Sequence, residues 1–125
     1  PTGFATLSAT AHQTPWQMAP MVSTFRAQAM ADAKSRFGVD GPSLTDANAL
    51  AEWAQNSGAA RIITADAPVG PTKTLLDAYD QLTNVPPLIR LRRDFDATAW
   101  PLATKGFFKF RKHIPDLLDS FVKTD

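Results

Sequence analysis

The sequence contains no cysteine in its 125 residues. This absence excludes disulfide bonds, thiolate catalysis, and zinc or iron–sulfur sites with cysteine ligands. No apolar run approaches the roughly 18 residues that a membrane-spanning helix needs, and the first residues show no basic segment followed by an apolar one. We therefore predict a cytoplasmic protein with no membrane segment.

Histidine is also scarce, and the two copies are far apart in the sequence. His12 and His113 are separated by about 100 residues, and neither has carboxylates around it at a metal-binding spacing. We therefore predict neither a metal site nor acid–base catalysis by histidine.

Net charge is small, because 13 Lys and Arg residues stand against 12 Asp and Glu residues, for a total of +1. A balance of this kind argues against bulk coating of nucleic acid and against an acidic tail. The distribution is uneven, however, since residues 90–112 contain seven basic and two acidic side chains. This segment is therefore the candidate surface for an anionic partner.

Length and composition indicate one domain with a hydrophobic core, because 44% of the 125 residues are hydrophobic. We interpret residues 1–20 as an irregular segment that can hold a short strand from Phe4 to Leu7. Residues 21–125 are predicted to form an α/β domain. The irregular start indicates a piece of a longer protein.

Apolar residues spaced by three or four predict the first helices. One helix is expected from Met21 to Phe37, ended by Gly38. A second is expected to begin at an N-cap hydroxyl of Ser43 or Thr45 and to stop near Gly58, with its tryptophan in the core.

The middle of the chain predicts a strand, a helix and a second strand. Ala60 to Thr64 has the short, continuous apolar character of a central parallel strand covered on both faces. A helix follows from Pro71 to Leu82, then a strand from Leu88 to Leu91, and a last amphipathic helix begins near Ile114. Two strands joined by a helix imply a parallel crossover. The predicted fold is a three-layer α/β domain, with a small, mostly parallel, Rossmann-like sheet and helices on both faces.

The loop after the first of these two strands is a candidate ligand site. Open α/β sheets bind ligands at the carboxyl ends of strands, where a helix N-terminus can also receive an anion. The alternative is an ordinary turn, because the loop has only one glycine and matches neither a dinucleotide fingerprint nor a phosphate-binding loop. The candidate cofactor-binding residues are Asp66, Pro68, Gly70 and Thr72.

A second candidate is the segment from Lys105 to Lys112, in which cations alternate with three phenylalanines. Such a surface can follow phosphates while its rings stack on bases. Alternatively, the phenylalanines pack against a partner domain and the cations face water. The candidate contacts to an anionic partner are Arg92, Arg93, Lys109 and Arg111.

Asp94 and Asp96 follow the second strand, and on an extended segment their side chains would point the same way. Paired carboxylates can perform acid–base chemistry or bind metal. Because two arginines precede them directly, we favour local ion pairing.

Three segments together resemble a known family. They are LAEWAQNSGAARIITADAPVGPTKTLLDAYDQL, then PPLIRLRRDFDATAWP, then TKGFFKFRKHIPDLL. Their order is similar to the second half of the amino-terminal α/β domain of DNA photolyases and cryptochromes, with a likeness from about Leu44 to Leu118. The family's first strand and its loop are not recognisable before Leu44.

The resemblance implies a light-driven flavoprotein in DNA repair, a deoxyribodipyrimidine photo-lyase that splits cyclobutane pyrimidine dimers by electron transfer from reduced flavin. The present chain would hold or border an antenna chromophore and would not itself be catalytic. The FAD, and contact with DNA, would belong to a helical partner domain of the same protein that has no counterpart here. No catalytic residue can therefore be assigned to this chain.

Two other classes of function stay open. One is a non-enzymatic α/β module that binds a nucleotide, nucleic acid or protein partner through the same loop and basic segment. The other is a small nucleotide-using enzyme whose catalytic groups come from another domain.

Overall fold

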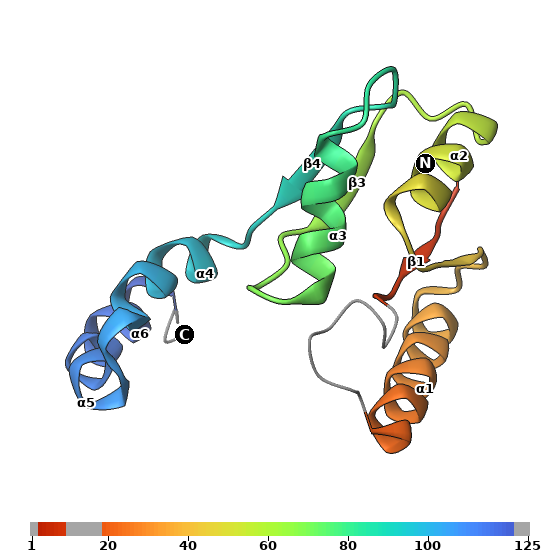
Figure 1. Ribbon diagram of the computed structural model, residues 1–125. Helices are drawn as coiled ribbons and strands as arrows, with labels where there is room; N and C mark the ends of the chain where they lie inside the picture. The colour runs from red at the N-terminus through yellow and green to blue at the C-terminus, as the bar shows by residue number, and fades with distance from the viewer. Residues whose placement is uncertain (1–2, 10–18, 122–125) are drawn as a thin grey trace. The chain divides into compact units, whose positions relative to one another are not determined.

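The computed structural model describes residues 3–9 and 19–121 (Figure 1). His12 lies outside the described residues. The chain divides into two compact units, Pro1–Arg90 and Leu91–Asp125, called here the first and second units.

The first unit alternates strands and helices. The order is β1 (Thr6–Leu7), α1 (Pro20–Phe37), β2 (Ser43–Leu44), α2 (Ala47–Asn56), β3 (Ile62–Ala65), α3 (Pro71–Asp80) and β4 (Leu88–Leu91), the last residue of which belongs to the second unit. Apart from Leu91, the regular elements in the described part of the second unit are helices. They are α4 (Asp94–Ala99), the 3₁₀ helix η2 (Trp100–Lys105), α5 (Phe107–Phe110), the 3₁₀ helix η3 (Arg111–His113) and α6 (Ile114–Phe121).

The strands of the described residues form two small parallel sheets, and this mixed helix and strand content is compatible with the predicted α/β class, but the strands do not form a single sheet. β1 pairs with β2 in a register that places Thr6 opposite Ser43 and Leu7 opposite Leu44. β3 pairs with β4, and the helix α3 connects them, as the sequence predicted. A sequence pattern locates strands but does not define which strands are neighbours, because pairing depends on contacts between distant residues.

The core of the first unit lies where α2 and α3 meet. Its buried residues are Leu44, Leu50, Ala51, Leu76 and Tyr79. Apolar residues at i, i+3 and i+4 give each helix one face that can leave water. The strands β3 and β4 pack the side chains of Ile62 and Leu88 against this cluster. Tyr79 is 1% exposed, and its hydroxyl donates a hydrogen bond of 2.7 Å to the Pro86 carbonyl.

β3 is not covered on both faces, which corrects the prediction of a central strand. Ile62 and Thr64 are half-buried, whereas Ile63 is 60% exposed and Ala65 is also exposed. β4 alternates in the same way, with Ile89 exposed. The run of apolar residues therefore describes a strand with one packed face and one open apolar face.

The helix ends show one confirmed and one wrong prediction. Gly38 ends α1 with a φ of 60°, a left-handed conformation that glycine adopts at little cost. The N-cap of α2 is Asp46 and not a hydroxyl of Ser43 or Thr45: the Asp46 Oδ1 accepts a 2.9 Å hydrogen bond from the Ala49 N–H. Asp and Ser are equally good caps, so the residue type alone did not decide between them.

The second unit has little buried surface. Among its described residues, Ala99 and Leu117 are the buried hydrophobic ones. The rings of Phe95 and Phe121 meet edge to face with centroids 5.5 Å apart, and the α6 helix begins at Ile114, as predicted.

Candidate functional site

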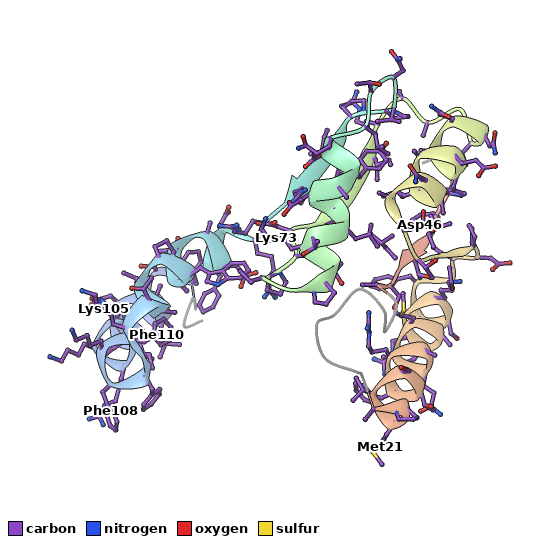
Figure 2. The ribbon with its side chains drawn as sticks, in the orientation of Figure 1. Met21, Asp46, Lys73, Lys105, Phe108 and Phe110 are labelled. Carbon is purple, nitrogen blue, oxygen red and sulfur yellow. The ribbon has the colours of Figure 1, made fainter. Side chains whose placement is uncertain are left out.

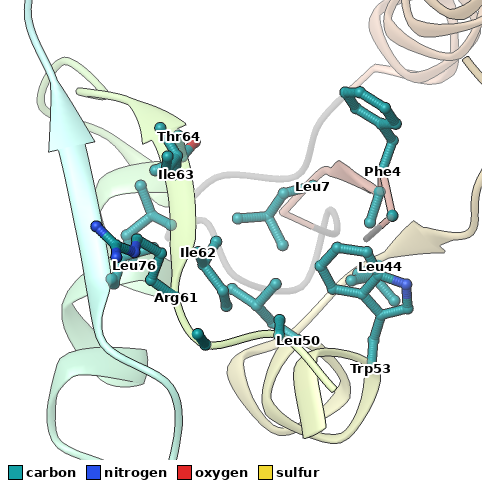
Figure 3. Close-up of a pocket in the computed structure, with 15 residues that line it drawn as sticks. Phe4, Leu7, Leu44, Leu50, Trp53, Arg61, Ile62, Ile63, Thr64 and Leu76 are labelled. Carbon is teal, nitrogen blue, oxygen red and sulfur yellow. The ribbon is translucent and has the colours of Figure 1, made fainter. Parts of the chain in front are cut away.

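A groove in the first unit lies between β1 and β3, and Figure 3 shows its lining. We call it the β1–β3 groove. Its volume is about 570 Å³. It is lined mainly by apolar side chains, including Phe4, Leu7, Leu44, Leu50, Trp53, Ile62, Ile63 and Leu76. Arg61 is the cationic residue among the lining residues.

The groove is assembled from both ends of the first unit. Leu7 comes from β1, Leu44 from β2, Trp53 from α2, and Ile62 from β3 (Figure 3). Sequence reasoning did not find it, and placed Trp53 simply in the core, whereas this side chain is half-buried. The signal available was the apolar stretch of β1, but which strand lies across from it depends on the tertiary fold.

Three of the four candidate cofactor-binding residues lie on the loop from β3 to α3, and the fourth, Thr72, lies in the first turn of α3. Asp66, Gly70 and Thr72 are half-buried, and Pro68 is exposed. Gly70 has a φ of 150°, a conformation that disfavours any side chain, and its carbonyl accepts a 3.0 Å hydrogen bond from the Thr74 N–H in the first turn of α3. The loop is thus a constrained turn at the carboxyl end of β3, as predicted, and its role in binding stays a prediction.

The cation nearest in sequence to this loop is already paired. The Lys73 Nζ lies 2.6 Å from the Asp77 carboxylate one turn later (Figure 2). From β4, the Arg90 guanidinium contacts the same carboxylate at 2.8 Å and Asp80 at 2.5 Å. Hydrogen bonds from Lys73 and then Arg90 hold the pKa of Asp77 below its usual range, because they stabilise the charged form.

This cluster of Lys73, Asp77, Asp80 and Arg90 connects α3 to β4. The Arg90 side chain is 19% exposed, and its hydrogen bond to Asp77 raises its pKa. The sequence analysis did not predict this cluster. The spacing of Asp77 and Asp80, three residues apart on one helix face, was the available signal.

Arg92 and Arg93, two of the predicted anion contacts, have partners within the second unit. The Arg93 guanidinium donates to both carboxylate oxygens of Asp96, at 2.7 and 3.0 Å, and this hydrogen bonding lowers the Asp96 pKa. The guanidinium of Arg92 lies 4.8 Å from the centre of the Trp100 ring, a cation–π contact. The predicted local ion pairing is confirmed. Asp94 and Asp96 begin the helix α4, however, so the expected extended segment is wrong, and negative charge there is favoured by the helix dipole.

The segment from Lys105 to Lys112 is mostly helical, and two of its three phenylalanine rings are open to solvent, whereas Phe110 is half-buried. Phe107 and Phe108 are 63% and 81% exposed, with ring centroids 5.8 Å apart. Figure 2 shows Phe108 and Lys105 at the surface of the second unit. Lys109 lies on α5 and Arg111 on η3, and both side chains are exposed.

The predicted sites therefore separate into two groups. The loop residues belong to the first unit and the four basic residues to the second. In the described residues, no set of three or more His, Asp or Glu side chains is grouped to hold a metal ion. No helix within 3–9 and 19–121 combines the length and apolar character needed to cross a membrane. Compared with known protein families, curated proteins and solved structures, the chain matches none of them.

Proposed function

We propose that this chain is the α/β part of a cytoplasmic, light-driven flavoprotein of the photolyase and cryptochrome type, working in the repair of cyclobutane pyrimidine dimers. In this proposal its two parallel sheets belong to one three-layer, Rossmann-like domain that is completed by other parts of the protein. The chain borders an antenna chromophore and contributes no catalytic group.

One observation carries the proposal: the order of the parts of the chain. A parallel β3–α3–β4 unit with a constrained loop after β3 is followed directly by a helical unit with exposed phenylalanines. This order follows the three segments that resemble the family. An α/β domain that borders a helical partner domain needs an apolar surface for it, and Phe107 and Phe108 supply one.

The roles of the chain's residues follow from their positions. Asp66, Pro68, Gly70 and Thr72 form the edge of the antenna site, where the turn presents backbone and a carboxylate at the carboxyl end of β3. The exposed side chains of Lys109 and Arg111 contact an anionic partner or cofactor. The neighbouring domain would hold the FAD, which in its reduced form would supply the electron for splitting the dimer.

The first test is an absorption spectrum of the protein purified from its natural source, with its intact mass measured on the same sample. Flavin bands on a chain several times longer than this one support the proposal. A colourless protein of about this length contradicts it.

A second test addresses the antenna loop. Gly70→Val is expected to remove an antenna band from the spectrum and leave the flavin bands, because φ at this position disfavours a side chain. Gly38→Val is the matched control, since Gly38 also has positive φ but lies at the end of α1. An equal loss in both variants contradicts a role of the loop.

The exposed rings favour one alternative, a module that binds single-stranded nucleic acid. Stacking of a base on a phenylalanine contributes about 1–3 kcal/mol, so Phe108→Ala is expected to weaken binding by about 5- to 150-fold. Phe37→Ala is the control, because Phe37 is 79% exposed in the first unit. Affinity for an oligonucleotide that falls steeply with salt supports this alternative, and affinity that does not depend on salt contradicts it.

A further inference from the structure

The strand β3 has an open edge on the side of the β1–β3 groove. The Ile62 N–H donates a 2.9 Å hydrogen bond to the Pro87 carbonyl, at the start of β4. Because successive residues of a strand direct their backbone groups to opposite edges, those of Ile63 face away from β4. Among the described residues, β4 is the single strand neighbour of β3.

The strand β1 has the same property. Thr6 and Ser8 donate backbone hydrogen bonds of 2.9 Å to the carbonyls of Pro42 and Leu44 in and beside β2. The backbone groups of Leu7 therefore face the edge opposite β2. In the part of the chain that the structure describes, β2 is the single strand neighbour of β1.

The groove lies between these strands and is apolar. Figure 3 shows Leu7 directed across it toward Ile62. A volume of about 570 Å³ can hold a small molecule as well as side chains. A small apolar molecule, however, would leave the backbone donors and acceptors of both strands without partners, whereas a β-strand carries such groups on both of its edges.

Within Ile62–Ala65, the edge of β3 also lacks the charged residues and prolines that keep sheet edges from pairing. Such edges are normally protected by lysine, proline, bulges or inward-pointing charge. The four residues Ile62–Ala65 include no charge and no proline, and Ile63 is 60% exposed. An apolar, unprotected edge beside an apolar groove is typical of a site for strand addition.

We propose that the β1–β3 groove receives an apolar β-strand from a partner polypeptide outside these 125 residues. This strand pairs with the open edge of β3 and with the open edge of β1. It thereby joins the two small sheets into one continuous sheet and fills the groove with its side chains. The inference does not depend on a flavin or on light.

The test uses the full chain and a short soluble peptide in which valine alternates with threonine between terminal lysines. Amide hydrogen exchange is measured by NMR with and without the peptide. Exchange is expected to slow at Leu7 and Ile63, whose amides face the groove, and to stay unchanged at Ile62, whose amide is already bonded to Pro87. No binding at millimolar peptide, or binding without slowed exchange at Leu7 and Ile63, overturns the proposal.

Two variants at one position separate backbone pairing from burial of the side chain. Ile63→Pro removes the N–H that faces the groove and is expected to weaken peptide binding about tenfold, the equivalent of one hydrogen bond. Ile63→Thr keeps that N–H and is expected to change binding about twofold. Circular dichroism checks that both variants are folded. If Ile63→Pro does not fold, the proposal is tested by the exchange rates at Leu7 and Ile63 in the unchanged protein. Equal peptide binding by the two folded variants overturns the proposal. Exchange that slows at higher protein concentration without peptide also overturns it, because this would indicate that a second copy of the chain occupies the groove.

Discussion

The two units use similar residues but bury very different amounts of them. In the first unit, leucines and a tyrosine from α2, α3 and β2 form one buried cluster, whereas in the second the buried hydrophobic residues among those described are Ala99 and Leu117. The second unit also has a local ion pair between Arg93 and Asp96, three residues apart, and a ring contact between Phe95 of α4 and Phe121 of α6. Burial in a shared core therefore contributes more to the first unit than to the second.

This difference follows from chain length and element type. Stability from burial scales with the apolar area removed from water, and a unit of helices shorter than ten residues has little area to bury. Residues 91–121 also keep aromatic rings at the surface, since Phe107 and Phe108 are exposed. The second unit is thus suited to gain its burial from a partner.

The largest expected effect comes from two buried leucines, one in each unit. Leu76→Ala is expected to reduce the free energy of unfolding by about 2–5 kcal/mol, because Leu76 is 1% exposed within the core and its loss leaves a cavity. Leu117→Ala, at a residue 5% exposed in the second unit, is the matched variant and is expected to cost less. Urea unfolding followed by circular dichroism measures both. Equal losses would show that the second unit has a core comparable to the first.

The same contrast explains what the sequence could predict. Helical periodicity located α1 and α3, and the strand Leu88–Leu91 was predicted at its observed bounds, because these signals lie within one element. The open face of β3 was not predicted. An apolar run indicates the capacity for burial on both faces, and whether a neighbour covers Ile63 depends on other parts of the chain.

The candidate sites show the same limit. The loop with Gly70 could be placed at the carboxyl end of β3 from local signals alone, namely a strand, a glycine and Pro71. The partners of Arg90 could not be predicted from local signals, because Asp77 and Asp80 contact Arg90 only after α3 packs on the β3–β4 sheet. The groove was missed for the same reason.

A smaller effect is expected from the buried polar contact of Tyr79 in the core of the first unit. Tyr79→Phe removes the hydroxyl that donates to the Pro86 carbonyl, and it is expected to cost about 0.5–1.5 kcal/mol of unfolding free energy. Burial, with a smaller effect of the Asp80 charge, raises the pKa of Tyr79 above its usual value near 10.

The raised pKa of Tyr79 predicts the direction in which the free energy of unfolding changes in alkaline solution. Above about pH 10 the unfolded chain releases the tyrosine proton while the folded chain keeps it, so the native state loses stability as the pH rises. Tyr79→Phe is expected to weaken that loss. Urea titrations at neutral and alkaline pH measure it, and the same alkaline decline in both proteins would contradict the burial of this hydroxyl.

A third, smaller effect is expected at the start of α2, at the edge of the first core. Asp46→Ala removes the side-chain acceptor for the Ala49 N–H and is expected to cost about 1 kcal/mol. Asp46→Asn keeps an acceptor oxygen and serves as the control, with a loss of a few tenths of a kcal/mol. Thermal unfolding measures both variants. If Asp46→Ala left the stability unchanged, the cap would contribute nothing to the first unit.

The smallest effect lies in the second unit and concerns a local ion pair. Arg93→Gln removes the charge that, through its hydrogen bonds, holds the pKa of Asp96 below its usual range, so the pKa of Asp96 is expected to rise. A depressed carboxyl pKa stabilises the folded unit above the unfolded pKa, near 4, and this contribution disappears as the pH falls through the folded pKa. Carbon NMR of the Asp96 carboxyl measures the titration, and Arg111→Gln, on the same unit, is the control. A rise in the Asp96 pKa in both variants would mean that the overall charge of the second unit, and not the Arg93–Asp96 pair, lowers this pKa. The second unit would then depend less on this local contact than its structure indicates.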